Sequence, residues 1–170
     1  MYRLLFILVV LLAGLGVQKI HAQARSTASI TAEVVYPTSA KEQSELSFGH
    51  CAPGPQGGQV QLRPDGEIST KGSIVLINND YSPARFYITG IQEQAFSISL
   101  SEGPTILSHN GSSNTILVHD WDSSPSAGET WKLEGGALNV NVGAILDVNN
   151  MNGNPLGVYT GIYSIIFNYH

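Results

Sequence analysis

Three polar side chains close together in the stretch "VHDWD" have the types and spacing for chemistry: His119, Asp120 and Asp122. On a β-strand, Asp120 and Asp122 would share one face, and His119 and Trp121 would share the other. Two carboxylates at this spacing could help to hold calcium, or could act as a glycosidase pair if a cleft separated them properly. We favour a simpler interpretation, a solvated strand face opposite a buried Trp121.

The other chemistry-bearing residues form no recognisable motif. The five histidines lack the H-x-x-x-H or Cys/His spacing of metal sites, and no G-x-S-x-G elbow accompanies the many serines. The glycines of "GPQGG" and "EGG" neither open a helix nor supply a P-loop lysine, and we interpret them as turn residues. Trp121, Trp131 and several tyrosines could form a sugar platform, although alternating aromatic residues are more often core. We therefore expect no catalytic residue, no metal site and no cofactor.

The first residues of the chain predict export. A single early arginine, Arg3, precedes the apolar stretch "LLFILVVLLAGLGV", and "HAQA" then places Ala22 and Ala24 in the small-x-small pattern of a signal-peptidase site. The apolar stretch is shorter than the about 20 residues that a membrane-spanning helix needs. We interpret residues 1–24 as a cleaved secretory signal and residues 25–170 as a single domain, with no membrane span after cleavage.

The charge of residues 25–170 limits their possible partners, and their single cysteine limits how the fold can be stabilised. This part of the chain carries six Lys/Arg against thirteen Asp/Glu, a net charge of −7, which argues against nucleic acid and anionic membranes. Cys51 is the only cysteine, so the chain cannot form an internal disulfide despite the predicted export. We expect Cys51 to be a buried, inert thiol and the fold to depend on its hydrophobic core.

Short alternating runs bounded by Gly, Pro, Asn and Ser recur along the chain, and helical periodicity is almost absent. Hairpin-type Asn-Gly pairs occur at Asn110-Gly111 and Asn152-Gly153. Strands every 8–12 residues with turn signals between them indicate an all-β sandwich. The expected strands cover residues 28–36, 45–51, 58–64, 72–78, 84–90, 95–101, 114–122, 129–134 and 137–148, followed by a terminal run at 157–170.

The terminal run, "GVYTGIYSIIFNYH", alternates up to the end of the sequence. One face carries Tyr159, Gly161, Tyr163, Ile165, Phe167 and Tyr169. Its β-branched and aromatic composition predicts one long strand, which at about 3.3 Å per residue would reach roughly 40 Å. A strand this long and apolar must be paired with something.

This ending resembles the C-terminal signature of an uncharacterised family of secreted bacterial domains, close to G-x-Y-x-G-x-[FY]-x-[VI]-x-[VI]-x-Y. The stretches "TASITAEVVYP", "LSFG", "FYITG" followed by "AFSISL", and "GALNVNVGAILDV" fit the same family, so the resemblance covers essentially all of residues 25–170. That family in turn resembles the subunits of chaperone–usher fimbriae and the spore-coat-U-like pilins. Those subunits tend to carry a penultimate tyrosine and a glycine fourteenth from the end, which Tyr169 and Gly157 match.

The resemblance implies an immunoglobulin-like, pilin-like antiparallel β-sandwich that lacks one strand and receives it from a neighbour. It implies an acceptor-groove strand formed by Gly157, Tyr159, Tyr163, Ile165, Phe167 and Tyr169. It also implies a periplasmic chaperone and an outer-membrane usher as partners, besides neighbouring copies or related subunits. The chain departs from many such pilins in having no internal disulfide and only a short segment before Pro37.

The start of residues 25–170 has the pattern of a donor strand, with Ile30, Ala32 and Val34 alternating with polar residues. We therefore expect a non-enzymatic structural subunit of a surface fibre or coat, exported to the periplasm and then to the cell surface or medium. The alternative is a self-complemented monomeric surface adhesin or glycan-binding domain. The two differ in whether residues 25–36 pair within their own sandwich or with a neighbour.

Overall fold

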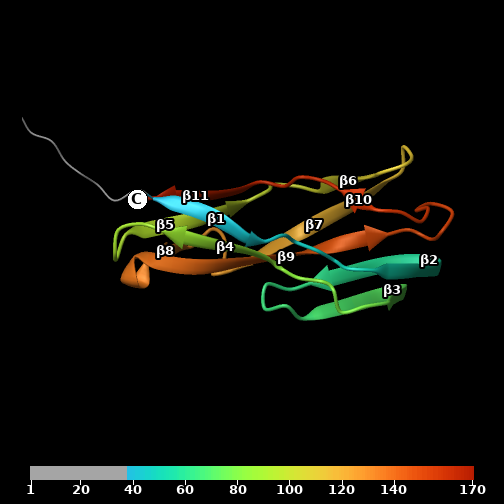
Figure 1. The fold of residues 1–170 in the computed structure, drawn as a ribbon, viewed down its shortest axis with the longest axis horizontal. Coiled ribbons are helices and arrows are strands. Elements are labelled where there is room, and N and C mark those ends of the chain that lie inside the picture. The colour runs from blue at the N-terminus through green and yellow to red at the C-terminus, as the bar shows by residue number, and fades with distance from the viewer. Residues whose placement is uncertain (1–37) are drawn as a thin grey trace, which may run out of the picture. The chain divides into compact units, whose positions relative to one another are not determined.

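The computed structural model describes residues 38–170, which lie in one compact unit, Val35–His170. The predicted signal at 1–24 and the predicted strand at 28–36 lie outside the described residues. Every strand pair in the described part is antiparallel, and its only helical element is a 3-10 turn at Glu134–Gly136, so the predicted all-β class is confirmed (Figure 1). None of the helical structure within residues 38–170 is long and apolar enough to cross a membrane.

The strands form two sheets. One has eight strands in the order β1-β4-β9-β7-β6-β10, with the β2–β3 ribbon joined to β9, and the other has the order β11-β5-β8. The strands are β1 (Ser39–Ser44), β2 (Cys51–Leu62), β3 (Ile68–Leu76), β4 (Ala84–Thr89), β5 (Ala95–Leu100), β6 (Thr105–His109), β7 (Thr115–Ser124), β8 (Thr130–Lys132), β9 (Ala137–Val148), β10 (Tyr159–Thr160) and β11 (Ile165–Tyr169).

β9 is the common partner of three other strands. Its residues 137–142 pair with β4 and its residues 144–148 pair with β2, so the neighbour on this edge changes at Gly143. Its other edge pairs with β7. A Cβ atom at Gly143 would overlap the main-chain oxygen of Leu62. Gly143 therefore lets β2 approach closely at the point where the pairing of β9 with β4 stops.

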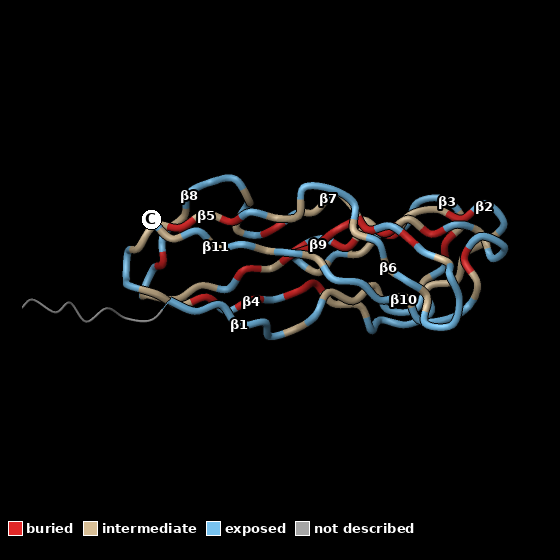
Figure 2. The backbone as a smooth tube through the Cα atoms, turned by 90° about the horizontal axis from the view of Figure 1, so that it is seen from above, coloured by how far each residue is buried: buried red, intermediate tan, exposed pale blue. Residues whose placement is uncertain are grey.

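The buried apolar side chains form two clusters, and Leu46 and Trp121 pack against both. Buried segments are concentrated on central strands such as β4 and β9, while β1 is almost entirely exposed (Figure 2). The first cluster contains Ala84, Phe86, Ile88, Phe96, Ile98, Leu133, Val140 and Val142. The second contains Val60, Ile74, Ile116, Val118, Ala144, Leu146 and Val148.

The strands predicted at 84–90, 95–101, 114–122, 129–134 and 137–148 correspond to β4, β5, β7, β8 and β9. The predictions at 58–64 and 72–78 each cover only part of a longer strand, β2 or β3. These were recognisable because most of them alternate apolar and polar residues around a buried face.

Other predictions were wrong. β1 was missed because its sequence, "SAKEQS", has no apolar alternation, and β6 was also missed. The glycines of "GPQGG", predicted as turn residues, lie within β2, where a register shift between Pro53 and Gly58 accommodates them. The strand predicted at 45–51 is instead largely irregular, with an isolated bridge between Ser47 and Ser82.

The terminal run is two strands rather than one. β10 pairs with β6 in the larger sheet, whereas β11 pairs with β5 in the smaller sheet, so residues 161–164 cross from one sheet to the other. Gly161 allows this crossing, since a Cβ there would lie 2.6 Å from the main-chain oxygen of Ile106. The predicted alternation is nevertheless present, because the odd-numbered residues 159 and 163–169 are partly buried and the even-numbered ones are exposed.

We expect Phe96, a member of the first cluster, and Phe167, which packs against that cluster, to differ in their contribution to stability. Phe96 is fully buried, so Phe96→Ala should lower the free energy of unfolding by about 3–5 kcal/mol. Phe167 packs edge-on against Phe86 with ring centroids 5.9 Å apart, but it remains partly exposed. Phe167→Ala should therefore cost less, about 2 kcal/mol. Urea unfolding of both variants measures the difference. Equal losses in the free energy of unfolding would show that Phe167 contributes as much as a fully buried phenylalanine, and would contradict this expectation.

Candidate functional site

The main candidate site is an open groove of about 820 Å³ beside the C-terminal strands. One wall consists of Glu42, Glu45, Leu46 and Phe48, on β1 and the segment that follows it. The other wall consists of residues 159–166, which include β10 and the crossing segment. Core side chains such as Phe86 and Trp121 also line the groove, so its lining is largely apolar and aromatic.

Two open sheet edges lie at this groove. In the described part of the chain, β1 pairs only with β4, and β11 pairs only with β5. The main-chain nitrogen of His170 donates to the oxygen of Ala95 at 2.9 Å. The alternation of an antiparallel ladder then directs the main-chain groups of Ile165, Phe167 and Tyr169 away from β5. An extended segment placed there could form hydrogen bonds with this edge.

Two buried polar atoms at the groove have no hydrogen-bond partner among the described residues: Trp121 Nε1 and Tyr163 Oη. The two rings stack, with centroids 4.6 Å apart and an interplanar angle of 18°. Burial, with a smaller contribution from the Glu42 carboxylate, raises the pKa of Tyr163 to about 12. Tyr163 therefore keeps its proton, and both groups are hydrogen-bond donors that lack an acceptor.

Three of the six predicted groove residues line the groove: Tyr159, Tyr163 and Ile165. Phe167 and Tyr169 pack against the first core cluster instead. Burial raises the pKa of Tyr169, whose hydroxyl also lacks a partner in the described structure. The predicted donor residues Ile30, Ala32 and Val34 lie outside the described residues.

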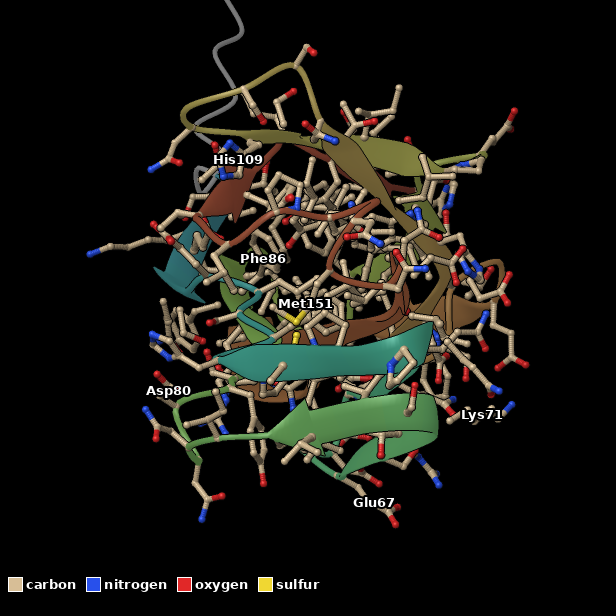
Figure 3. The ribbon with its side chains drawn as sticks, turned by 90° about the vertical axis from the view of Figure 1, so that its right-hand side faces the viewer. Glu67, Lys71, Asp80, Phe86, His109 and Met151 are labelled. Atoms are coloured by element: carbon tan, nitrogen blue, oxygen red, sulfur yellow. The ribbon has the colours of Figure 1, made fainter. Side chains whose placement is uncertain are left out.

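Gly157, the sixth predicted groove residue, makes room for His109. His109 Nε2 donates to the main-chain oxygen of Leu156 at 3.0 Å, and its Nδ1 accepts from the main-chain nitrogen of Gly111 at 3.0 Å. Its ring packs edge-on against Tyr159, at a centroid distance of 4.9 Å, beside β10 (Figure 3). A Cβ atom at Gly157 would overlap the imidazole. The alternation of the terminal run gave no sign of His109, because this contact is not local in sequence.

The "VHDWD" stretch lies on β7 and contains a bulge between His119 and Asp122. Asp120 has a φ of +49°, which is uncommon for a residue other than glycine. The extra residue shifts the alternation, so Trp121 packs into both core clusters while His119 pairs across the sheet with Ile145. The expectation that His119 and Trp121 share a face is therefore wrong.

His119 links the bulge to β9. Its Nδ1 lies 3.2 Å from Asp120 Oδ2 and its Nε2 lies 3.1 Å from Asp147 Oδ2. Gln59 Nε2 donates to the other oxygen of Asp147 at 2.8 Å. Partial burial by itself lowers the pKa of His119, but the hydrogen bonds to Asp147 and Asp120 raise it overall. When it is protonated, His119 can donate to both carboxylates and so links β7 to β9. An open cleft of about 780 Å³ borders this cluster.

The structure gives Asp120 and Asp122 different partners. Asp122 accepts a hydrogen bond from the main-chain nitrogen of Ser123 at 2.8 Å, whereas Asp120 contacts His119. Within residues 38–170, no group of three or more His, Cys, Asp or Glu side chains could hold a metal ion. The sequence gave no hint of Asp147 as the second carboxylate, because β9 brings it next to His119 only in the folded sheet.

Cys51 lies at the start of β2 and is partly buried. Burial raises the pKa of its thiol. The neutral thiol is therefore favoured over the nucleophilic thiolate.

Residues 38–169 match the family described as "Domain of unknown function (DUF4402)". The chain belongs to this family. The match covers both walls of the groove and all the strands of the DUF4402 domain, and it agrees with the expected membership of an uncharacterised family. No curated protein matches the chain.

Gly157→Ala should destabilise the DUF4402 domain, because the new methyl group displaces His109 from its hydrogen bonds. We expect a loss of about 1–3 kcal/mol in the free energy of unfolding, as for other overpacked sites. Gly103→Ala is the control, since a Cβ there would meet no atom within 4 Å. In the background of His109→Ala, the further cost of Gly157→Ala should be smaller. Additive losses in thermal unfolding would show that His109 is not the obstacle.

The His119 link should make stability depend on pH. Because the folded state raises the pKa of His119, its contribution is complete below the ordinary value of 6.5 and is lost as pH rises through the folded-state value. We expect a decrease on the order of 1 kcal/mol in the free energy of unfolding across this range. His119→Gln should remove this decrease, and His170→Gln should keep it. Chemical denaturation at pH 6 and pH 9 measures the change, and an unaltered pH profile in His119→Gln would exclude the link.

Proposed function

We propose that the chain is a non-enzymatic, exported structural subunit of a bacterial surface fibre or coat, assembled by β-strand donation. The observation that supports this most is the groove between β1 and residues 159–166, which among the described residues has an unpaired sheet edge on each side. Adding a strand to such an edge supplies main-chain hydrogen bonds for affinity and side-chain pockets for specificity. An extended segment in the groove would use both edges at once.

The exposed apolar residues near the groove support the proposal, because they indicate a surface that a partner covers in the assembled state. Ile162 is 92 % exposed and Ile166 is 55 % exposed, and both line the groove. An open apolar edge of this kind promotes aggregation when it stays uncovered. A partner strand would cover it and would also offer carbonyl groups to Trp121 Nε1 and Tyr163 Oη.

The donor in this proposal is residues 25–36 of a neighbouring copy, with Ile30, Ala32 and Val34 entering the groove. These residues alternate with Thr31, Glu33 and other residues just before the described domain begins. The resemblance to chaperone–usher fimbrial subunits implies two further partners. A periplasmic chaperone would cover the groove first, and an outer-membrane usher would direct assembly. The pilin-like, immunoglobulin-like form of the sandwich belongs to the same proposal.

The test places charge on the inserted face of the donor. Ile30→Asp with Val34→Asp should leave a subunit that is exported but cannot polymerise, because a carboxylate in an apolar groove costs several kcal/mol. The matched control is Thr31→Asp with Val35→Asp, which adds the same charge to the opposite face and should preserve assembly. Non-reducing gels of unboiled native envelope protein measure polymer length.

A synthetic peptide covering residues 27–36 completes the test. It should raise the melting temperature of the Ile30→Asp, Val34→Asp subunit in proportion to the logarithm of peptide concentration. If wild-type protein is a stable monomer at high concentration and the peptide has no effect, the fibre proposal fails. The self-complemented surface domain then takes its place.

A further inference from the structure

Glu42 is a charged residue on the inner face of an open sheet. In the β1–β4 register it lies directly opposite Phe86, which is 9 % exposed and belongs to the first core cluster. Directly opposed residues of an antiparallel pair have their side chains on the same face of the sheet. The Glu42 carboxylate therefore lies on the side of the core, where it lines the groove and contributes to the raised pKa of Tyr163.

Glu45 adds a second carboxylate to the same wall. Within residues 38–170, neither Glu42 nor Glu45 forms a salt bridge with a Lys, Arg or His side chain. No basic residue lines the groove either, whereas the aromatic residues Tyr159 and Tyr163 do. Unpaired carboxylates beside aromatic rings are a favourable environment for a cation.

We propose that the groove selects a strand with a basic side chain, and that in the assembly this side chain is Arg25 of the neighbouring copy, held by Glu42 and Glu45. The inference rests on the proposed strand donation and adds the charge that the donor must carry. Arg25 is the only Lys or Arg within residues 25–36, and Glu33 is the only acidic residue there. In an extended chain, Arg25 lies about 17 Å from Ile30, so its side chain would reach a different part of the groove from the apolar residues that insert.

The choice of arginine fits the chemistry of the groove walls. A guanidinium group can bind a carboxylate through two parallel hydrogen bonds and can also stack on an aromatic face. Both kinds of partner are available on this groove, on opposite walls. An apolar donor without a basic residue would leave two carboxylates unpaired and partly desolvated when it bound.

The experiment measures binding of peptides covering residues 25–36 to the full-length Ile30→Asp, Val34→Asp subunit, which has no functional donor of its own. Calorimetry gives the dissociation constant. Replacing Arg25 by Gln in the peptide should weaken binding about tenfold, and so should Glu42→Gln with Glu45→Gln in the subunit. Combining the two changes should produce little further loss. Glu129→Gln, at an exposed carboxylate before β8, is the control and should bind like the parent subunit.

Charge reversal provides a gain-of-function arm. A peptide with Arg25→Glu should bind poorly to the parent subunit and should recover affinity toward a subunit with Glu42→Arg.

If the Arg25→Gln peptide binds as tightly as the native peptide, this inference is overturned while strand donation stands. The same conclusion follows if Glu42→Gln with Glu45→Gln leaves affinity unchanged but causes aggregation, because the carboxylates would then only protect the edge. If no peptide binds to any subunit, the proposed function fails as well.

Discussion

β9 carries the hydrogen bonds of three other strands, and the arrangement of the larger sheet depends on how it divides them. β4 and β2 share one edge in succession, and β7 occupies the other. The change of neighbour requires β2 to come close at Gly143, where a side chain would overlap the main chain of Leu62. On the β7 side, Asp122 pairs with Gly143 immediately after the bulge. The change of neighbour on one edge of β9 and the bulge on the other edge therefore lie at the same level of this strand.

The bulge has a consequence for the whole core, because it turns Trp121 inward at the junction of the two apolar clusters. Without the extra residue, the alternation that buries Val118 would direct Asp120 inward and Trp121 outward. His119 holds the bulge by pairing with Asp120 and with Asp147 of β9. A surface group of polar side chains thus fixes the position of a buried aromatic residue that also lines the groove.

The strands predicted best from the sequence are those whose own residues carry a clear apolar and polar pattern. β9 was placed at its exact bounds because twelve consecutive residues follow a strand pattern, and the alternation around Phe167 was also correct. β1 could not be found in this way, since it gains its strand conformation from pairing with β4 and buries almost nothing. The break in the terminal run depends on the close approach of Gly161 to β6, which no local pattern records. His109 and His119 likewise each have a partner far away in the sequence, Leu156 and Asp147 respectively.

The groove combines features that weaken an isolated domain. Buried donors without acceptors cost about 1–3 kcal/mol each, and within residues 38–170 neither Trp121 Nε1 nor Tyr163 Oη has an acceptor. Within residues 38–170, β1 and β11 each also leave one main-chain edge without a partner strand, and Ile162 leaves a large apolar side chain exposed to water. A strand that fills the groove improves all of these at once, because its carbonyls accept from the two donors and its side chains cover the apolar wall. Under the proposed function, the same residues that limit the stability of the free subunit therefore supply the free energy of its assembly.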